Sequence, residues 1–254
     1  MSSIGTGYDL SSTTYSPDGR VFQVEYASKA VDNSGTAVGI RVSDGVVFGV
    51  EKLLISPMLL HGSNRRVSTI GRHIGVASSG LVADARALIN RGNQEANAWK
   101  STYGEEISVK VLTERLASFA QVYTLYGGVR PFGCALLLGS WTEAAGPQLY
   151  MIQPSGEAYG YFGVAVGKGK AACKTDIEKL DLESMTCEEA VVEIAKMIHS
   201  VHDSDKDKEY ELELSWVCRA SGGRHQLVPA ELRDSALAIA TAESSDDDSS
   251  SDDD

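Results

Sequence analysis

Residues 16–32 read SPDGRVFQVEYASKAVD, a reverse turn followed by a helix with a broad apolar face. Pro17 fixes φ and Gly19 tolerates a positive φ, which is the chemistry of a turn. Along the helix that follows, apolar side chains cover an arc of about 200°, roughly twice what a helix lying on a single surface needs. We therefore predict a helix over residues 20–31 that is covered on two sides, by its own domain and by a second subunit.

Beyond this helix the chain alternates between runs of strands and pairs of helices. Two β-branched runs surround an Asp-Gly turn at residues 43–45, which predicts a hairpin, and a similar pair surrounds residues 71–72. The predicted strands are residues 36–42, 46–52, 66–70, 73–77, 132–139, 148–153, 158–163 and 210–218. The further predicted helices are residues 82–100, 109–126, 168–181, 187–202 and 229–242. This order predicts an α+β fold in which two stacked antiparallel sheets carry helices on both outer faces, a four-layer α-β-β-α sandwich.

The 254 residues are expected to form one domain with a polar segment at each end. Residues 1–15 are small and polar and are predicted to be a mobile N-terminal tail. Residues 16–242 make up the domain. Residues 243–254, ESSDDDSSSDDD, contribute seven of the negative charges behind the formal net charge of -12 and are predicted to be a disordered acidic tail.

Composition excludes several classes of function. The mildly acidic body has no basic footprint for nucleic acid, and no apolar run approaches the roughly 18 residues of a membrane span. The first fourteen residues lack the basic and apolar regions of a secretory signal. We expect neither a nucleic-acid nor a membrane partner. Four cysteines without any C-x-x-C spacing predict buried free thiols in a reducing compartment: Cys134, Cys173, Cys187 and Cys218.

Three motifs resemble ligand or catalytic sites but each lacks an essential part. Gly163–Lys168 has three residues instead of four between its glycines, and the next position lacks the hydroxyl that a phosphate loop requires. His199 and His202 precede Asp203 without a distant third ligand, so a solvated helix face is favoured over a metal site. Residues 78–80, Ser-Ser-Gly, lack the serine-hydrolase elbow. No metal and no cofactor is predicted.

The N-terminal stretch resembles the opening of alpha-type subunits of the 20S proteasome. The resembling segments are residues 7–10 (GYDL), 16–27 (SPDGRVFQVEYA), 45–52, 73–81, 123–126, 130–133 and 175–180. The resemblance implies the N-terminal nucleophile hydrolase fold, in agreement with the predicted sandwich. It further implies a non-catalytic subunit of a seven-membered alpha ring that caps the beta rings during ubiquitin-dependent protein degradation in the cytoplasm and nucleus. Leu10, where most alpha-type subunits carry Arg, and the acidic tail resemble one subtype within the family.

Beta-type members of this family are threonine proteases, which raises an alternative function. Their nucleophile is an N-terminal Thr that is freed by cleavage after a Gly, and Gly35-Thr36 lies at about the corresponding place. The residues that precede Thr36 contain the alpha-type helix rather than a disposable leader. Glu51 stands where the active relatives have a catalytic Asp, and Val67 stands near their catalytic Lys. We therefore predict that the chain is not an enzyme; a threonine hydrolase and a free-standing acidic adaptor are the alternatives.

The resemblance implies a gate cluster, which between neighbouring alpha subunits stabilises the open arrangement of the N-terminal tails. Its members match Tyr8, Asp9, Pro17 and Tyr26. A phenol and a carboxylate can form a hydrogen bond across such an interface. The alternative is that Tyr26 and Pro17 only pack the helix.

The resemblance also implies a pocket that accepts the C-terminal tails of regulatory ATPases. Its members match Gly19, Arg66, Gly80 and Leu81. Arg66 replaces a Lys of the family and can bind a terminal carboxylate in bidentate fashion. The alternative is a solvated loop cation.

The acidic tail carries serines that have Asp three residues further on, a pattern that suits acidophilic kinases. These candidate phosphorylation sites are Ser244, Ser245, Ser249, Ser250 and Ser251. The alternative is an unmodified solubilising tail.

Overall fold

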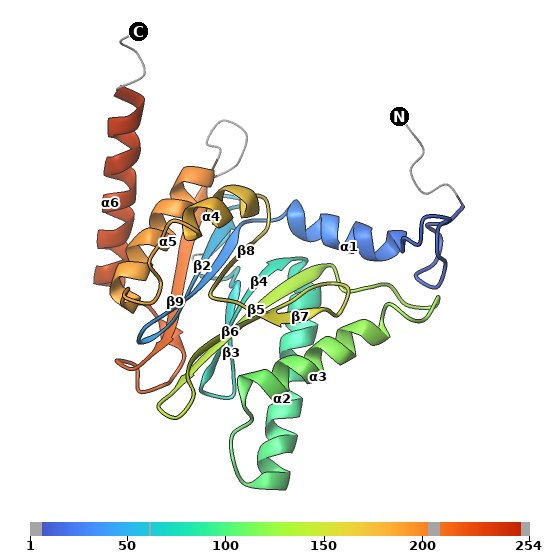
Figure 1. Cartoon of the computed structure of the whole chain (residues 1–254). Helices are drawn as coiled ribbons and strands as arrows, with labels where there is room; N and C mark the ends of the chain where they lie inside the picture. Colours follow the sequence, from blue (N-terminus) through green and yellow to red (C-terminus); the bar gives the residue numbers. More distant parts are fainter. Residues whose placement is uncertain (1–6, 61, 203–208, 250–254) are drawn as a thin grey trace.

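Two five-stranded antiparallel sheets lie face to face at the centre of the molecule, a computed structural model that describes residues 7–60, 62–202 and 209–249 (Figure 1). One sheet has the order β10 (Gln226–Leu227), β9 (Tyr210–Cys218), β2 (Gly45–Leu53), β1 (Ala37–Val42) and β8 (Gly163–Val166). The other has the order β3 (Val67–Ile70), β4 (Ile74–Gly80), β5 (Cys134–Thr142), β6 (Gly146–Ile152) and β7 (Ala158–Gly160).

Helices cover the outer face of each sheet and complete the four layers. The helices are α1 (Phe22–Asp32), α2 (Val82–Tyr103), α3 (Val109–Val122), α4 (Lys170–Ile177), α5 (Cys187–Val201) and α6 (Ala230–Ser249). Helices α2 and α3 lie on the β3–β7 sheet, α4 and α5 lie on the other sheet, and α6 packs beside α5 (Figure 1). The predicted α-β-β-α sandwich is confirmed.

Strand β2 shows how side chains that alternate between the two faces of a strand build these layers. Phe48 belongs to the core between the sheets, whereas Val47 belongs to the core beneath α5, and both side chains are fully buried. At Gly49 the helix approaches the strand so closely that an added Cβ would lie 2.2 Å from Cγ2 of Ile194. The glycine therefore sets the distance between α5 and the sheet.

Residues 158–163 were predicted as one strand, but the chain changes sheets within this stretch. The amide of Tyr161 still donates to the carbonyl of Leu149 in one sheet, 2.9 Å away, and the carbonyl of Phe162 accepts from the amide of Arg41 in the other, 2.8 Å away. The single prediction is therefore wrong, and β7 and β8 form instead. Because residues on both sides of the switch stay hydrogen-bonded, the chain changes sheets without leaving these backbone groups unpaired.

The last helix continues through residues 243–249, where the sequence predicted the acidic tail to begin. After Pro229 the sequence contains no Gly or Pro that would end a helix. Lys196 of α5 pairs with Glu243 at 2.7 Å, which ties this extension to the body. Residues 250–254, with the candidate phosphorylation sites Ser250 and Ser251, lie outside the described residues, and disorder there stays a prediction.

Candidate functional site

Asp9 and Tyr26, two members of the predicted gate cluster, lie in contact. The Tyr26 hydroxyl donates to Oδ2 of Asp9 at 3.2 Å, and the side-chain amide of Gln23 donates to the Asp9 carbonyl oxygen. Partial desolvation and the Asp9 carboxylate raise the pKa of Tyr26 above its usual value, so the phenol stays a hydrogen-bond donor. Helix α1 thus holds the N-terminal segment at Asp9.

A second anchor holds this segment at Ser12, which is buried. The Ser12 hydroxyl donates to the carbonyl oxygen of Tyr126, 3.1 Å away, in the loop between α3 and β5. Residues 1–15 were predicted as a mobile tail, yet residues 7–15 are bonded to two separate elements. Residues 1–6 lie outside the described residues.

The loop that receives Ser12 is itself clamped to α2. Arg130 donates from Nη1 and Nη2 to the two carboxylate oxygens of Asp84, at 2.6 and 3.0 Å. The same carboxylate accepts from the amide of Gly133 at 2.9 Å, and these donors lower the pKa of Asp84. Sequence reasoning missed this clamp; an acidic residue in the first turn of a long helix was the only available signal.

Tyr8 and Pro17, the other members of the gate cluster, lie on the surface. The predicted turn is present: the amide of Gly19 donates to the Ser16 carbonyl at 2.9 Å, and Gly19 has φ +76°. On α1 the side chains of Phe22, Ala27 and Val31 are buried, whereas Tyr26 remains 39% exposed. The chain itself therefore covers one side of this helix.

Arg66, Gly80 and Leu81 of the predicted pocket meet beside the start of α2. Nη1 of Arg66 donates to the Gly80 carbonyl at 3.0 Å, and the Arg66 amide donates to Oε2 of Glu213 at 2.9 Å. Burial lowers the pKa of the Arg66 guanidinium below its usual value, and the nearby Glu213 carboxylate partly offsets this. Its Nε is buried and has no hydrogen-bond partner among the described residues. This environment differs from that of a solvated loop cation.

Gly19, the fourth predicted pocket residue, is not part of this group within the chain. Leu81 lies near Ala30, because a Cβ on Gly133 would be 2.9 Å from the Leu81 side chain and 3.6 Å from the Ala30 Cβ. Ala30 lies near the C-terminal end of α1, whereas Gly19 precedes its N-terminal end. At a rise of 1.5 Å per residue the two are about 16 Å apart along the helix. Figure 1 shows that the N-terminal end projects away from the sheets.

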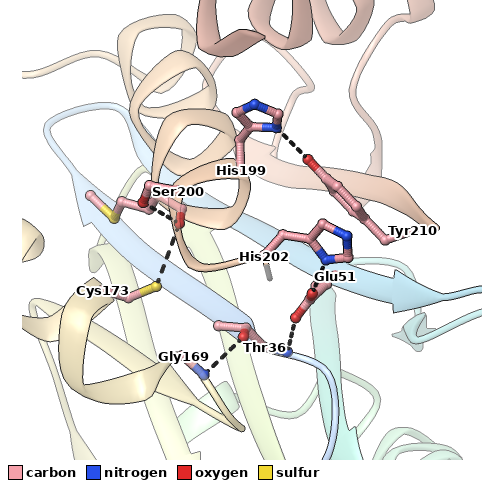
Figure 2. A network of polar contacts seen from close by, with 9 residues as sticks. Thr36, Glu51, Gly169, Cys173, His199, Ser200, His202 and Tyr210 are labelled. Carbon is pink, nitrogen blue, oxygen red and sulfur yellow. Dashed lines mark hydrogen bonds and ion pairs between the residues drawn. The ribbon is translucent and has the colours of Figure 1, made fainter. Parts of the chain in front are cut away.

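Thr36 is enclosed in a polar network beneath α5 (Figure 2). Its backbone N–H donates to Oε2 of Glu51 at 2.9 Å, and its hydroxyl accepts from the amide of Gly169 at 3.0 Å. Oε1 of the same glutamate lies 2.8 Å from Nδ1 of His202. Thr36 is 1% exposed and Glu51 4% exposed. The threonine therefore has both polar backbone and side-chain groups bound inside the fold.

The prediction that His199 and His202 lie on a solvated helix face is wrong. His202 is bonded to Glu51, and its ring lies 4.4 Å from that of Tyr210. Nδ1 of His199 lies 3.0 Å from the Tyr210 hydroxyl. His199 lies in the last turn of α5 and His202 directly follows the helix, which packs against β2 and β9, and only the fold places their partners there. Asp203 lies outside the described residues.

The glycine motif at residues 163–168 spans β8 and the start of the turn that leads to α4. Gly167 has φ +94°, and an added Cβ would lie 2.5 Å from the carbonyl oxygen of Gly35. The glycines thus allow the start of α4 to approach Thr36 closely.

Two features of the described residues bear on metal ions and membranes. In that part of the chain no group of three His, Cys, Asp or Glu residues is placed to hold a metal ion. None of its helices combines the length and the apolar character needed to cross a bilayer. The four cysteines are buried and free, as predicted.

Comparison with protein families matches residues 31–217 to the model described as "Proteasome subunit" and residues 8–30 to the N-terminal signature of proteasome subunits of the A type. The chain therefore belongs to the proteasome subunit family. The N-terminal signature places it among the alpha-type subunits, the non-catalytic members of the 20S alpha ring, which assemble with other proteasome subunits in protein degradation.

Relatives of known type show which alpha-type subunits the chain resembles in sequence. The chain is 62% identical to the alpha type-3 proteasome subunit of Acanthamoeba castellanii over 94% of both chains. It is 58% identical to the alpha type-3 subunit of Spinacia oleracea over 95% of this chain and 97% of the relative. It is 45% identical to the probable alpha type-7 proteasome subunit of Saccharomyces cerevisiae over 96% of this chain and 85% of the relative. The similarity to alpha type-3 subunits that Leu10 and the acidic tail indicated is confirmed.

Proposed function

We propose that this chain helps to gate substrate entry into the proteasome core and to dock regulatory particles on the alpha ring. The observation that carries the gating role is the double anchoring of the N-terminal segment, at Asp9 by Tyr26 and at Ser12 by the Tyr126 carbonyl. Two anchors on different elements fix the point from which the residues before Gly7 leave the body. A gate made of N-terminal tails requires such a fixed exit.

The exposed members of the gate cluster support contact with a neighbouring alpha subunit. Tyr8 and Pro17 are on the surface, and Tyr26 is still 39% exposed although it contacts Asp9. In a seven-membered ring this side faces another alpha subunit, and the hydrogen bond between Asp9 and Tyr26 holds the tail in its open arrangement.

Peptide hydrolysis by assembled particles tests the gating role. Tyr26→Phe removes the hydroxyl that binds Asp9 and keeps the ring, so we expect regulator-stimulated hydrolysis to fall several-fold. Tyr159→Phe is the matched control, because Tyr159 is an exposed tyrosine in β7. If Tyr26→Phe particles are stimulated as strongly as the control, the gating role of this bond is refuted.

Docking is assigned to Arg66, whose buried Nε has no partner among the described residues and can donate to the terminal carboxylate of an ATPase tail. Because Gly19 is distant from Arg66 within the chain, the pocket is proposed to lie at the junction of two subunits, with the wall that corresponds to Gly19 supplied by the neighbouring alpha subunit. Arg66→Ala should abolish binding of a tail peptide to the particle, and Arg72→Ala, which changes an exposed arginine, should leave it intact. Equal binding of the free-acid and C-terminally amidated peptides would refute carboxylate recognition.

We further propose that this chain has no proteolytic activity, and the contacts of Thr36 support this. Its nitrogen is a peptide amide bound to Glu51, and its hydroxyl is bound to the Gly169 amide. A threonine protease needs a free N-terminal amine at this place. Intact-mass analysis should therefore find no chain that begins at Thr36, and a species that does so would support the hydrolase alternative.

The remaining assignments are contact with beta-ring subunits, residence in cytoplasm and nucleus, and phosphorylation of the acidic tail. Ser244, Ser245 and Ser249 fall in the last turns of α6, and phosphate there would add negative charge to an acidic segment. Elution of the native chain near its monomer mass would favour the free-standing adaptor instead.

A further inference from the structure

Two of the four buried cysteines lie against each other at one end of the sandwich. Cys187 is the first residue of α5, and Cys218 is the last residue of β9, where it pairs in register with Gly45 of β2. The position that a Cβ on Gly45 would occupy is 2.7 Å from Sγ of Cys187 and 2.5 Å from Cβ of Cys218. The missing side chain of Gly45 is therefore what lets the two cysteines meet.

The hairpin turn before Gly45 holds both partners in this arrangement. The Asp44 carboxylate accepts from the Cys187 amide at 2.8 Å, and the Asp44 carbonyl accepts from the Arg219 amide at 2.9 Å. One residue of the turn is thus bonded to the start of α5 and to the residue after Cys218. A disulfide requires its two Cβ atoms to come within about 4 Å, and these bonds hold the backbones in place for that approach.

The proton distribution in the pair resembles that of a reactive dithiol. A hydrogen bond from the Cys187 thiol, assisted by Ser221, lowers the pKa of Cys218 to about 6 despite its burial. The same hydrogen bond, burial and Asp44 hold the pKa of Cys187 above its usual range. These opposite directions favour Cys218 as the sulfur that gives up its proton and Cys187 as the sulfur that keeps it, and a thiolate beside a thiol is the combination from which disulfides form.

Access to Cys218 is provided by the surface turn that follows it. Arg219 and Ala220 are exposed, and Gly222 and Gly223 both have positive φ. The Ser221 hydroxyl closes this turn by donating to the Cys218 carbonyl at 2.9 Å. Local opening of a short turn costs far less than global unfolding and admits a molecule as small as hydrogen peroxide.

We propose that Cys187 and Cys218 are a redox modification site that a hydroperoxide converts to a disulfide. The Cys218 thiolate attacks one peroxide oxygen, the O–O bond breaks, and the displaced hydroxide takes a proton from solvent to leave as water, which creates a sulfenic acid. The Cys187 sulfur then attacks the Cys218 sulfur, the S–O bond breaks, and a second water leaves with the Cys187 proton. Two thiols are oxidised by two electrons, and the peroxide is reduced to two waters.

The disulfide would join the start of α5 to the end of β9 and enclose the intervening chain in a covalent loop. Closing such a loop restricts the unfolded chain and stabilises the fold. The oxidised protein should therefore unfold at a higher urea concentration than the reduced protein.

The test exposes the native full-length chain to hydrogen peroxide, removes the excess with catalase, blocks free thiols and measures intact mass and unreduced peptides. We expect two fewer thiol-blocking groups than on the reduced chain, reversal by dithiothreitol, and a cross-linked peptide pair that contains Cys187 and Cys218. Cys187→Ser should leave Cys218 as a sulfenic acid that dimedone captures, and Cys218→Ser should give neither product. Cys173→Ser is the matched control and should form the cross-link normally, because burial raises the pKa of Cys173 to about 12 and leaves it unreactive.

Three results would overturn the proposal. The first is a disulfide that includes Cys134 or Cys173, and the second is oxidation of Cys218 to sulfinic acid without cross-linking. The third is an unmodified chain under conditions that oxidise free glutathione. The wild-type peptide map and Cys173→Ser decide the question even if the serine variants at Cys187 and Cys218 fail to fold.

Discussion

The Glu51 carboxylate accepts hydrogen bonds from two donors that come from different parts of the fold. Oε2 receives the backbone N–H of Thr36 at 2.9 Å, and Oε1 lies 2.8 Å from Nδ1 of His202 in the turn that ends α5. Glu51→Leu keeps a side chain of similar size but removes both acceptors. The Thr36 amide then stays buried without a partner, and His202 keeps only its contact with the Tyr210 ring.

The size of the expected loss in the free energy of unfolding follows from the burial of these two donors. An orphaned buried donor costs about 1–3 kcal/mol, and the His202 side chain, which is 10% exposed, recovers part of its share from water. The expected loss in the free energy of unfolding is about 3 kcal/mol. For a chain of this size 1 kcal/mol shifts Tm by about 2–4 °C, so Glu51→Leu should lower Tm by about 6–12 °C.

Circular dichroism of the full-length chain during heating measures this shift. Glu51→Gln keeps one carbonyl acceptor, so its Tm should fall by about half as much as that of Glu51→Leu. Glu183→Gln changes an exposed carboxylate and should leave Tm unchanged. A Glu51→Leu variant that melts within 2 °C of the wild type, on the scale just derived, would refute the account of this network.

Two further predictions concern acid stability and helix packing. Burial lowers the pKa of His225 to about 4 from an ordinary 6.5, so the unfolded chain binds the proton more readily than the folded chain between these values. The free energy of unfolding should therefore fall by about 3 kcal/mol as the pH drops from 6.5 to 4. Urea titrations at both pH values should show that His225→Gln loses this part of the pH dependence. Gly49→Ala should lower the free energy of unfolding by about 2 kcal/mol or more, because the new methyl group would lie 2.2 Å from Ile194. Urea denaturation measures this loss. Unchanged stability would contradict the prediction, because it would show that α5 can shift away from β2 without destabilising the fold.

Features that depend on neighbouring residues could be predicted from the sequence. The Asp-Gly hairpin turn, the Pro-Asp-Gly turn before α1 and the periods of the long helices depend on the chemistry of a few adjacent residues, and all are present in the structure. The order of strands and helices then sufficed for the sandwich, because few arrangements bury two sheets and their helices together.

Contacts between distant segments could not be predicted from one sequence. His202 reaches Glu51, and Arg130 reaches Asp84, only because the fold brings α5 to β2 and the loop before β5 to α2. The same limit applies to Cys187 and Cys218, whose proximity depends on the register of β9 against β2. Local patterns contain no information on these distances.

Native mass spectrometry of the particle that co-purifies with this chain tests the central claim most directly, because it reads composition, copy number and processing together. Our account predicts a complete core particle in which every copy of the chain keeps the segment before Thr36 and has a mass close to 27.1 kDa. Copies that begin at Thr36, or a chain recovered without other proteasome subunits, would contradict it.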